Sequence, residues 1–181
     1  MSLIPHPDRR PRHGISNPPP ALSLFSMELS RNLRVDSVSR LDPTPPHAIE
    51  DREPVAAAVA VLRREKVGCL LVTRQGKLVG IFTDRDLLAR VLAAGLPLSV
   101  PMAECLTANP VTVRPKDSVQ VAIKKMEKGG YRHLPVVDDA NRPVGILSAR
   151  RVVHYLVEHF PGLIYNQSPD PDRTPDLPEG A

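Results

Sequence analysis

The sequence predicts an α/β fold in which one strand–helix–strand–strand–helix unit occurs twice, the two sheets packing on each other as a pseudo-twofold pair. The first observation is a helical pattern of apolar residues at i, i+3, i+4 and i+7 that recurs 64 residues later. The second is a strand-to-helix stretch at residues 80–88 that recurs at residues 145–153. The repeated helix positions are Val55, Ala58, Val59 and Leu62 in the first copy, and Val119, Ala122, Ile123 and Met126 in the second.

Composition separates the middle of the chain from its two ends. The 181 residues are 41% hydrophobic but only 3% aromatic, so we expect an aliphatic core. Many of the 21 prolines lie before residue 47 or after residue 160, where little core can form. We therefore predict a Pro-rich mobile segment at residues 1–40 with a short helix near 22–33, repeats at 41–100 and 101–160, and a Pro- and Asp-rich tail at 161–181.

Each repeat can be followed element by element. The predicted strands are residues 47–49, 69–72 and 80–82 in the first repeat, and 110–113, 133–137 and 145–147 in the second. A strand–helix–strand connection implies a parallel pair, and the short turn that follows adds an antiparallel strand. The closing helix of the first repeat has Leu87, Leu88, Val91 and Leu92 as its apolar face. Helices on one face of each sheet leave the other faces to pack together.

The remaining composition excludes several classes of protein. The net charge is +4, but bases and acids are mixed in the repeats, which disfavours nucleic-acid binding. Cys69 and Cys105 lack the spacing of a metal site or a disulfide framework. No apolar run resembles a secretory signal or a membrane span, so we expect a cytoplasmic protein without a membrane partner. No nucleophile or metalloenzyme motif occurs, so neither an enzyme nor a cofactor is predicted.

One motif, Thr83-x-x-Asp86, marks the junction of strand and helix and has two interpretations. As a capping box, the Thr hydroxyl and the Asp carboxylate would satisfy free N–H groups at the helix start. Alternatively, the same hydroxyl and carboxylate would bind a ribose diol, with the helix N-terminus near an anion. The second copy keeps a hydroxyl at Ser148 but has Arg151 in place of the acid. Arg in a first turn opposes the helix dipole, so this position has either lost its site or faces an anion.

The pattern Gly-hydrophobic-x-Thr/Ser-x-x-Asp, together with residues 132–138 (RHLPVVD) and 106–115 (LTANPVTVRP), resembles the CBS domain family. The resemblance covers about residues 41–160 in two copies, a complete tandem pair or Bateman module. It implies a stand-alone regulatory module that binds AMP, ADP, ATP or a similar adenosine-containing ligand between the repeats, as energy sensors do. It also implies a disc-like homodimer and a regulated partner protein of unknown identity.

The resemblance assigns residues to two clefts. In the first cleft, Thr83 and Asp86 would hold the ribose, and Phe82 would line the base pocket. Other residues of that cleft would be Arg85, Thr107, Pro110, Val111, Tyr131, Arg132 and His133. Arg132 suits a phosphate because a guanidinium matches its oxygens, whereas His133 has the alternative of a structural contact. The degraded second cleft would comprise Ser148, Arg150, Arg151, Thr44 and Gly68.

Two alternatives to a sensing module remain open on the residues alone. The first is a structural or dimerisation adaptor with vestigial nucleotide sites, which the loss of the acid at Arg151 favours. The second and weaker is nucleic-acid binding through Arg150, Arg151 and the basic N-terminal segment, for which the sequence offers few aromatic residues to stack on bases.

Overall fold

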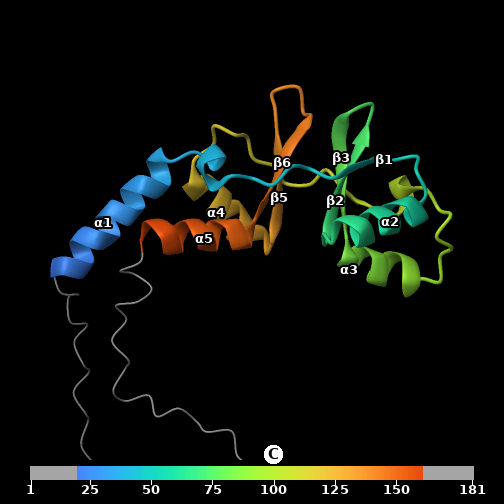
Figure 1. Ribbon diagram of the computed structural model, residues 1–181, viewed down its shortest axis with the longest axis horizontal. Helices are drawn as coiled ribbons and strands as arrows, with labels where there is room; N and C mark the ends of the chain where they lie inside the picture. The colour runs from blue at the N-terminus through green and yellow to red at the C-terminus, as the bar shows by residue number, and fades with distance from the viewer. Residues whose placement is uncertain (1–19, 161–181) are drawn as a thin grey trace, which may run out of the picture.

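The computed structural model describes residues 20–160 and has the predicted α/β architecture in two halves (Figure 1). The first half contains β1 (Ala48–Glu50), α2 (Val55–Glu65), β2 (Cys69–Arg74), β3 (Lys77–Thr83), α3 (Asp84–Asp86), the π-helix η2 (Leu87–Leu92) and the 3-10 helix η3 (Met102–Glu104). The second contains α4 (Val119–Gly129), β5 (His133–Val137), β6 (Pro143–Ser148) and α5 (Ala149–His159). Before them lie α1 (Pro20–Val35) and the 3-10 helix η1 (Val38–Leu41), and β4 (Thr107–Ala108) joins the halves.

The sheets follow the predicted connections in the first repeat. The strand order is β1-β2-β3-β4, with β1 parallel to β2 and the other pairs antiparallel. Strand β2 alternates between two cores: Leu70 and Val72 face the helices of the first half, whereas Cys69 and Leu71 face the second half. The interface between the two sheets is a small cluster of Cys69, Leu71, Leu78, Ile81, Val137 and Ile146. The predicted packing of sheet on sheet is therefore confirmed.

The leading strand of the second repeat differs from the prediction. Residues 110–113 form no strand, and only Val113 makes a parallel bridge, to Val136. Pro110 lacks an N–H group, so the ladder cannot extend through it. The residues just before it, Thr107 and Ala108, instead form β4 against β3 of the first repeat. The two-stranded sheet of the second half therefore contains only β5 and β6.

The segment before the first repeat belongs physically to the second half. Val38 and Leu41 are buried in the core around α4 and α5. The backbone N–H of Val38 donates to Asp117, and that of Val119 donates to Asp36. The boundary predicted at residue 40 thus falls inside a packed segment, and the short helix expected near residues 22–33 is α1. Residues 1–19 and the tail at 161–181 lie outside the described residues.

The closing helix of the first repeat is less buried than its sequence suggested. Val91 is fully buried, but the side chains of Leu88 and Leu92 are 62% and 54% exposed. The backbone N–H of Ala93 reaches back to Leu88 and that of Leu96 to Val91, which is the wider π spacing. The prediction that all four leucine and valine positions share one buried face is wrong. A π turn changes the angle between successive residues, so a pattern with a 3.6-residue period no longer describes one face.

Candidate functional site

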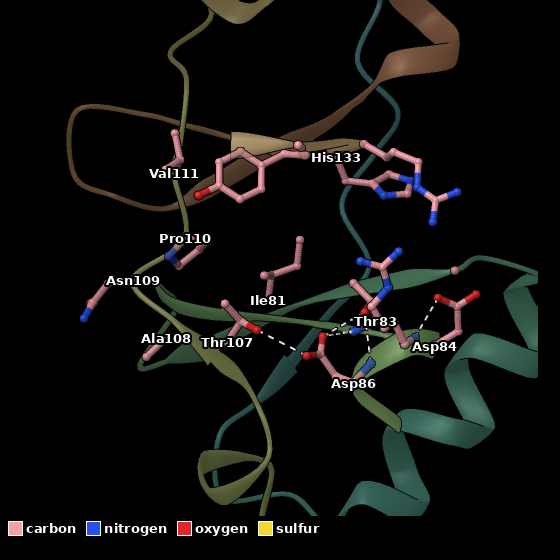
Figure 2. Close-up of a pocket in the computed structure, with 15 residues that line it drawn as sticks. Ile81, Thr83, Asp84, Asp86, Thr107, Ala108, Asn109, Pro110, Val111 and His133 are labelled. Carbon is pink, nitrogen blue, oxygen red and sulfur yellow. Dashed lines mark hydrogen bonds between the residues drawn. The ribbon is translucent and has the colours of Figure 1, made fainter. Parts of the chain in front are cut away.

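A cavity of about 430 Å³ lies between the two halves, at the end of β3 where α3 begins (Figure 2). Its floor comes from the first half and from β4, and its roof from the turn between α4 and β5. The lining residues are Gly68, Ile81, Thr83, Asp84, Arg85, Asp86, Thr107, Ala108, Asn109, Pro110, Val111, Gly130, Tyr131, Arg132 and His133. Nine of the ten residues predicted for the first cleft are among them.

Thr83 and Asp86 form the complete capping box. The backbone N–H of Asp86 donates to Thr83 Oγ1 at 3.2 Å, and the backbone N–H of Thr83 donates to Asp86 Oδ2 at 3.0 Å. The Thr83 hydroxyl also donates to Asp86 Oδ2, at 2.7 Å. Both residues line the cavity at the same time. The two interpretations of the motif are therefore compatible, since the cap fixes the carboxylate at the cavity floor.

The second carboxylate oxygen of Asp86 is tied to other parts of the chain. Thr107 Oγ1 donates to Asp86 Oδ1 at 3.2 Å, and Arg90 Nε lies 3.1 Å from the same oxygen. Arg90 also donates to the Leu106 carbonyl at 3.0 Å and to Thr107 Oγ1 at 3.2 Å. Arg90 was not among the predicted residues, although its i, i+4 spacing from Asp86 is a recognisable signal for an ion pair on a helix.

The charged side of the cavity contains Asp84, Arg85, Arg132 and His133. Burial, followed by the charge of Arg132, lowers the pKa of His133 below 6.5, although Asp84 opposes this. The thiol of Cys69, which belongs to the cluster between the two sheets, has its pKa raised to about 11 by burial and by the charge of Asp84. The cavity lining balances two guanidinium groups, Arg85 and Arg132, against two carboxylates, Asp84 and Asp86, and the guanidinium groups are the ones suited to an anion.

The apolar side contains Ile81, Pro110 and Val111 (Figure 2). Tyr131 also lines the cavity. The Tyr131 ring rests on Gly129, the last residue of α4. A Cβ at Gly129 would lie 1.9 Å from ring atom Cε2, so only glycine leaves room for the ring in this position. The tyrosine is 42% exposed and presents an aromatic surface at the roof of the cavity. Such a surface can stack on a planar base.

Two of the predicted site residues are placed differently by the structure. Phe82 is fully buried in the core of the first half, because successive residues of β3 point to opposite faces of the sheet. Its neighbour Ile81 lines the cavity instead. Gly68, which we assigned to the second cleft, lines the first. Four further lining residues were not predicted, although each of them adjoins a predicted residue: Asp84, Ala108, Asn109 and Gly130.

The equivalent position of the second half is built differently. Ser148 Oγ accepts from the backbone N–H of Arg151 at 3.3 Å, so the hydroxyl cap is retained. The guanidinium of Arg151 pairs with Asp42 at 3.0 Å, which identifies the anion that it faces. Thr44 pairs with Ile146 as Thr107 pairs with Ile81, and its hydroxyl donates to the Ile146 carbonyl at 3.2 Å. Arg150 is exposed.

The sequence is similar to that of known CBS domain proteins. The pattern of the family described as CBS domain matches residues 38–93 and 102–158. The chain is 31% identical over 100 residues to the CBS domain-containing protein YhcV of Bacillus subtilis, covering 55% of this chain and 71% of that protein. It is also 35% identical over 104 residues to the Meiotically up-regulated gene 70 protein of Schizosaccharomyces pombe. That match covers 57% of this chain but only 14% of the longer protein.

Solved structures share the fold. A CBS domain protein of Pyrobaculum aerophilum, PAE2072, was solved in complex with AMP; it is 27% identical with a TM-score of 0.60, covering 68% of this chain and 99% of that one. The CBS domain pair of protein MJ0100, solved with 5′-methylthioadenosine and S-adenosyl-L-methionine, is 27% identical with a TM-score of 0.61. It covers 68% of this chain and 98% of that one.

Neither a metal-binding cluster nor a membrane-spanning helix is found among the described residues, 20–160. No group of three or more His, Cys, Asp or Glu side chains in this part of the chain is placed to hold a metal ion. None of its helices combines the length and the hydropathy that a membrane span requires.

Proposed function

Because this chain belongs to the CBS domain family, with two tandem copies, we propose that it is a regulatory module that binds an adenosine-containing nucleotide in the cavity between its repeats. The observation that carries the proposal is the capped carboxylate of Asp86 at the floor of a cavity of about 430 Å³ lined by both halves. Cavities of roughly 300–1,000 Å³ are typical of small-molecule sites. Relatives of this fold were solved with AMP and with S-adenosyl-L-methionine.

Each part of the cavity suits one part of such a ligand. Asp86 and Thr83 offer acceptor oxygens for ribose hydroxyls, and Tyr131 and Ile81 offer apolar surface for the base. Arg85 and Arg132 supply positive charge for a phosphate group. These residues come from both repeats, so an occupied cavity would hold the halves together. We therefore propose AMP, ADP or ATP as the ligand class, and energy sensing as the regulatory role.

We propose only one such site per chain, because the second half lacks the carboxylate. At the position equivalent to Asp86 it presents the donor groups of Arg151, which already pair with Asp42. A ribose diol needs acceptors, so this side lacks the group that would hold it. We expect a stoichiometry of one ligand per chain.

Isothermal titration calorimetry with AMP, ADP, ATP and S-adenosylmethionine tests the proposal. Asp86→Ala should abolish most of the binding, whereas Arg151→Ala should change it little. Because Asp86→Ala also removes a helix cap, Ser118→Ala serves as the matched control: it removes a cap on α4, distant from the cavity lining. If Asp86→Ala and Ser118→Ala bind every nucleotide equally well, the assignment of the site is wrong.

We further propose that the module acts as a homodimer in the cytoplasm and regulates a partner protein without catalysing a reaction itself. Support for the dimer comes from Leu88 and Val153, which occupy equivalent positions in the two repeats. Both are more than half exposed, at 62% and 57%. Apolar side chains exposed at equivalent sites of the two repeats are candidates for contact with a second copy. Light scattering that finds a monomer at micromolar concentration would contradict the dimer.

A structural adaptor is the second candidate, favoured by one observation. Both oxygens of Asp86 already have partners within the chain, as they would in a purely structural network. A thermal shift assay separates the candidates, since a ligand at 100 times its dissociation constant stabilises the folded state by roughly 2.7 kcal/mol. No shift with any nucleotide would favour the adaptor.

A further inference from the structure

The guanidinium of Arg90 makes three contacts that join two parts of the cavity floor. Its Nε lies 3.1 Å from Asp86 Oδ1 in the first repeat. Its Nη1 and Nη2 donate to the Leu106 carbonyl and to Thr107 Oγ1, at 3.0 and 3.2 Å, in the segment that leads into the second repeat. The Asp86 carboxylate is 13% exposed, while Arg90 itself is 49% exposed and does not line the cavity.

The carboxylate of Asp86 has little spare capacity for a new partner. A carboxylate has about four lone-pair positions, two on each oxygen. Here Oδ2 accepts from the backbone N–H and the hydroxyl of Thr83, and Oδ1 accepts from the Thr107 hydroxyl and faces Arg90. Ribose hydroxyls that bind Asp86 must therefore replace existing donors.

The donors differ in how easily they can be replaced. The hydroxyls of Thr83 and Thr107 both donate to Asp86 (Figure 2). A hydroxyl can rotate and donate elsewhere. The N–H of Thr83 is fixed by the backbone, and Arg90 is fixed by its two further contacts with residues 106 and 107. Once ribose hydroxyls have replaced the threonine hydroxyls, Arg90 is the partner that keeps Asp86 Oδ1 in place. A planar guanidinium is suited to this, because it presents several donors in a rigid arrangement.

We propose that Arg90 is a positioning residue for ligand recognition: it orients the Asp86 carboxylate toward the ribose hydroxyls and locks the Leu106–Thr107 segment to it. The inference rests on the proposed function and adds a residue outside the cavity lining. It predicts that Arg90 affects recognition of the ribose hydroxyls, while the base and phosphate contacts stay unchanged. It also predicts that Arg90 stabilises residues 106 and 107 in the absence of any ligand.

Calorimetric titration with AMP and with 2′,3′-dideoxyadenosine 5′-monophosphate tests the first point. Wild type should prefer AMP, and Arg90→Ala should lower AMP affinity about tenfold, as for the loss of one hydrogen bond to a charged group, while the dideoxy analogue binds unchanged. Arg90→Lys keeps the charge but not the planar fork, so it should restore only part of the preference. Arg142→Ala is the matched control, because Arg142 also pairs with a carboxylate four residues away, in a turn outside the cavity lining.

Hydrogen exchange of the ligand-free protein tests the second point. Peptides covering residues 104–110 should exchange several-fold faster in Arg90→Ala than in wild type or Arg142→Ala. If Arg90→Ala keeps the full preference for AMP over the dideoxy analogue, or if its 104–110 segment exchanges at the wild-type rate, the proposal is overturned. If wild type binds neither nucleotide, the proposed function has failed, and the exchange result alone decides whether Arg90 holds this segment.

Discussion

Replacing Gly129 by alanine should weaken ligand binding without weakening the fold. A Cβ at this position would lie 1.9 Å from Cε2 of Tyr131 and 2.4 Å from Cζ, so the ring must leave its place over Gly129. Tyr131 is 42% exposed and is free to turn toward solvent, so the displacement breaks little packing. Gly129 is the last residue of α4, where alanine is favoured over glycine by up to about 1 kcal/mol. We therefore expect unchanged or slightly higher thermal stability.

The loss in binding follows from the role assigned to the ring. Stacking of a base on an aromatic side chain contributes about 1–3 kcal/mol, which corresponds to a change of roughly 5- to 150-fold in affinity. Calorimetry with AMP should show a loss in this range for Gly129→Ala, and the same loss for Tyr131→Ala. Tyr131→Phe is the control, since it keeps the aromatic ring in its place over Gly129 and should keep wild-type affinity. Wild-type affinity in Gly129→Ala would refute the assignment of Tyr131 as the base platform.

Four further predictions concern stability and are measured by thermal or urea unfolding. Phe82→Ala should destabilise the protein by about 3–5 kcal/mol, because it empties a fully buried site. Ile81→Ala, at the cavity, should lower the free energy of unfolding clearly less. Equal losses would contradict the assigned faces of β3. Gly80→Ala should cost about 1–3 kcal/mol, because its Cβ would lie 2.8 Å from Leu106 Cδ1; a neutral result would mean that Leu106 moves freely. Tyr155→Phe should lower the free energy of unfolding by about 1.5–3 kcal/mol, because it removes the hydrogen bond to Asp36 that joins α5 to the segment after α1. An unchanged unfolding midpoint would show that other contacts hold this segment. Finally, burial lowers the pKa of His133 in the folded state, so the unfolded state binds more protons just below pH 6.5. The free energy of unfolding should therefore fall as the pH decreases through that window. His133→Asn should remove this part of the pH dependence.

The fold could be predicted because local sequence patterns encode the helices and strands of each repeat, and these patterns occur twice. The helices α2 and α4 begin at Val55 and Val119, 64 residues apart, as the apolar pattern indicated. The same holds for the Thr83-x-x-Asp86 box, whose contacts span only three residues. Interactions of this range depend on sequence spacing alone, so the pattern determines them.

The features that could not be predicted depend on contacts between distant segments. Residues 110–113 have the composition of a strand, yet only Val113 pairs with β5, while the preceding Thr107 and Ala108 pair with β3 of the other repeat. Phe82 and Ile81 alternate on β3, and nothing local says which of them faces the cavity. Arg151 and Asp42 are 109 residues apart, so the partner of this arginine was visible only in the folded chain.

A comparison of the two helix starts shows what Asp86 does beyond capping. Ser148 caps α5 by its hydroxyl alone, with Arg151 at the third helical position, so the helix forms without an acid there. An exposed ion pair contributes only about 0–1 kcal/mol, so the pairing of Arg151 with Asp42 at 3.0 Å is not a requirement of stability either. The demands of the fold are therefore met by either side chain at this position. What differs is the chemistry offered to a ligand: the first half presents acceptor oxygens at the floor of a cavity, and the second presents donor groups. This difference is the physical basis for expecting one nucleotide site in a fold that is otherwise doubled.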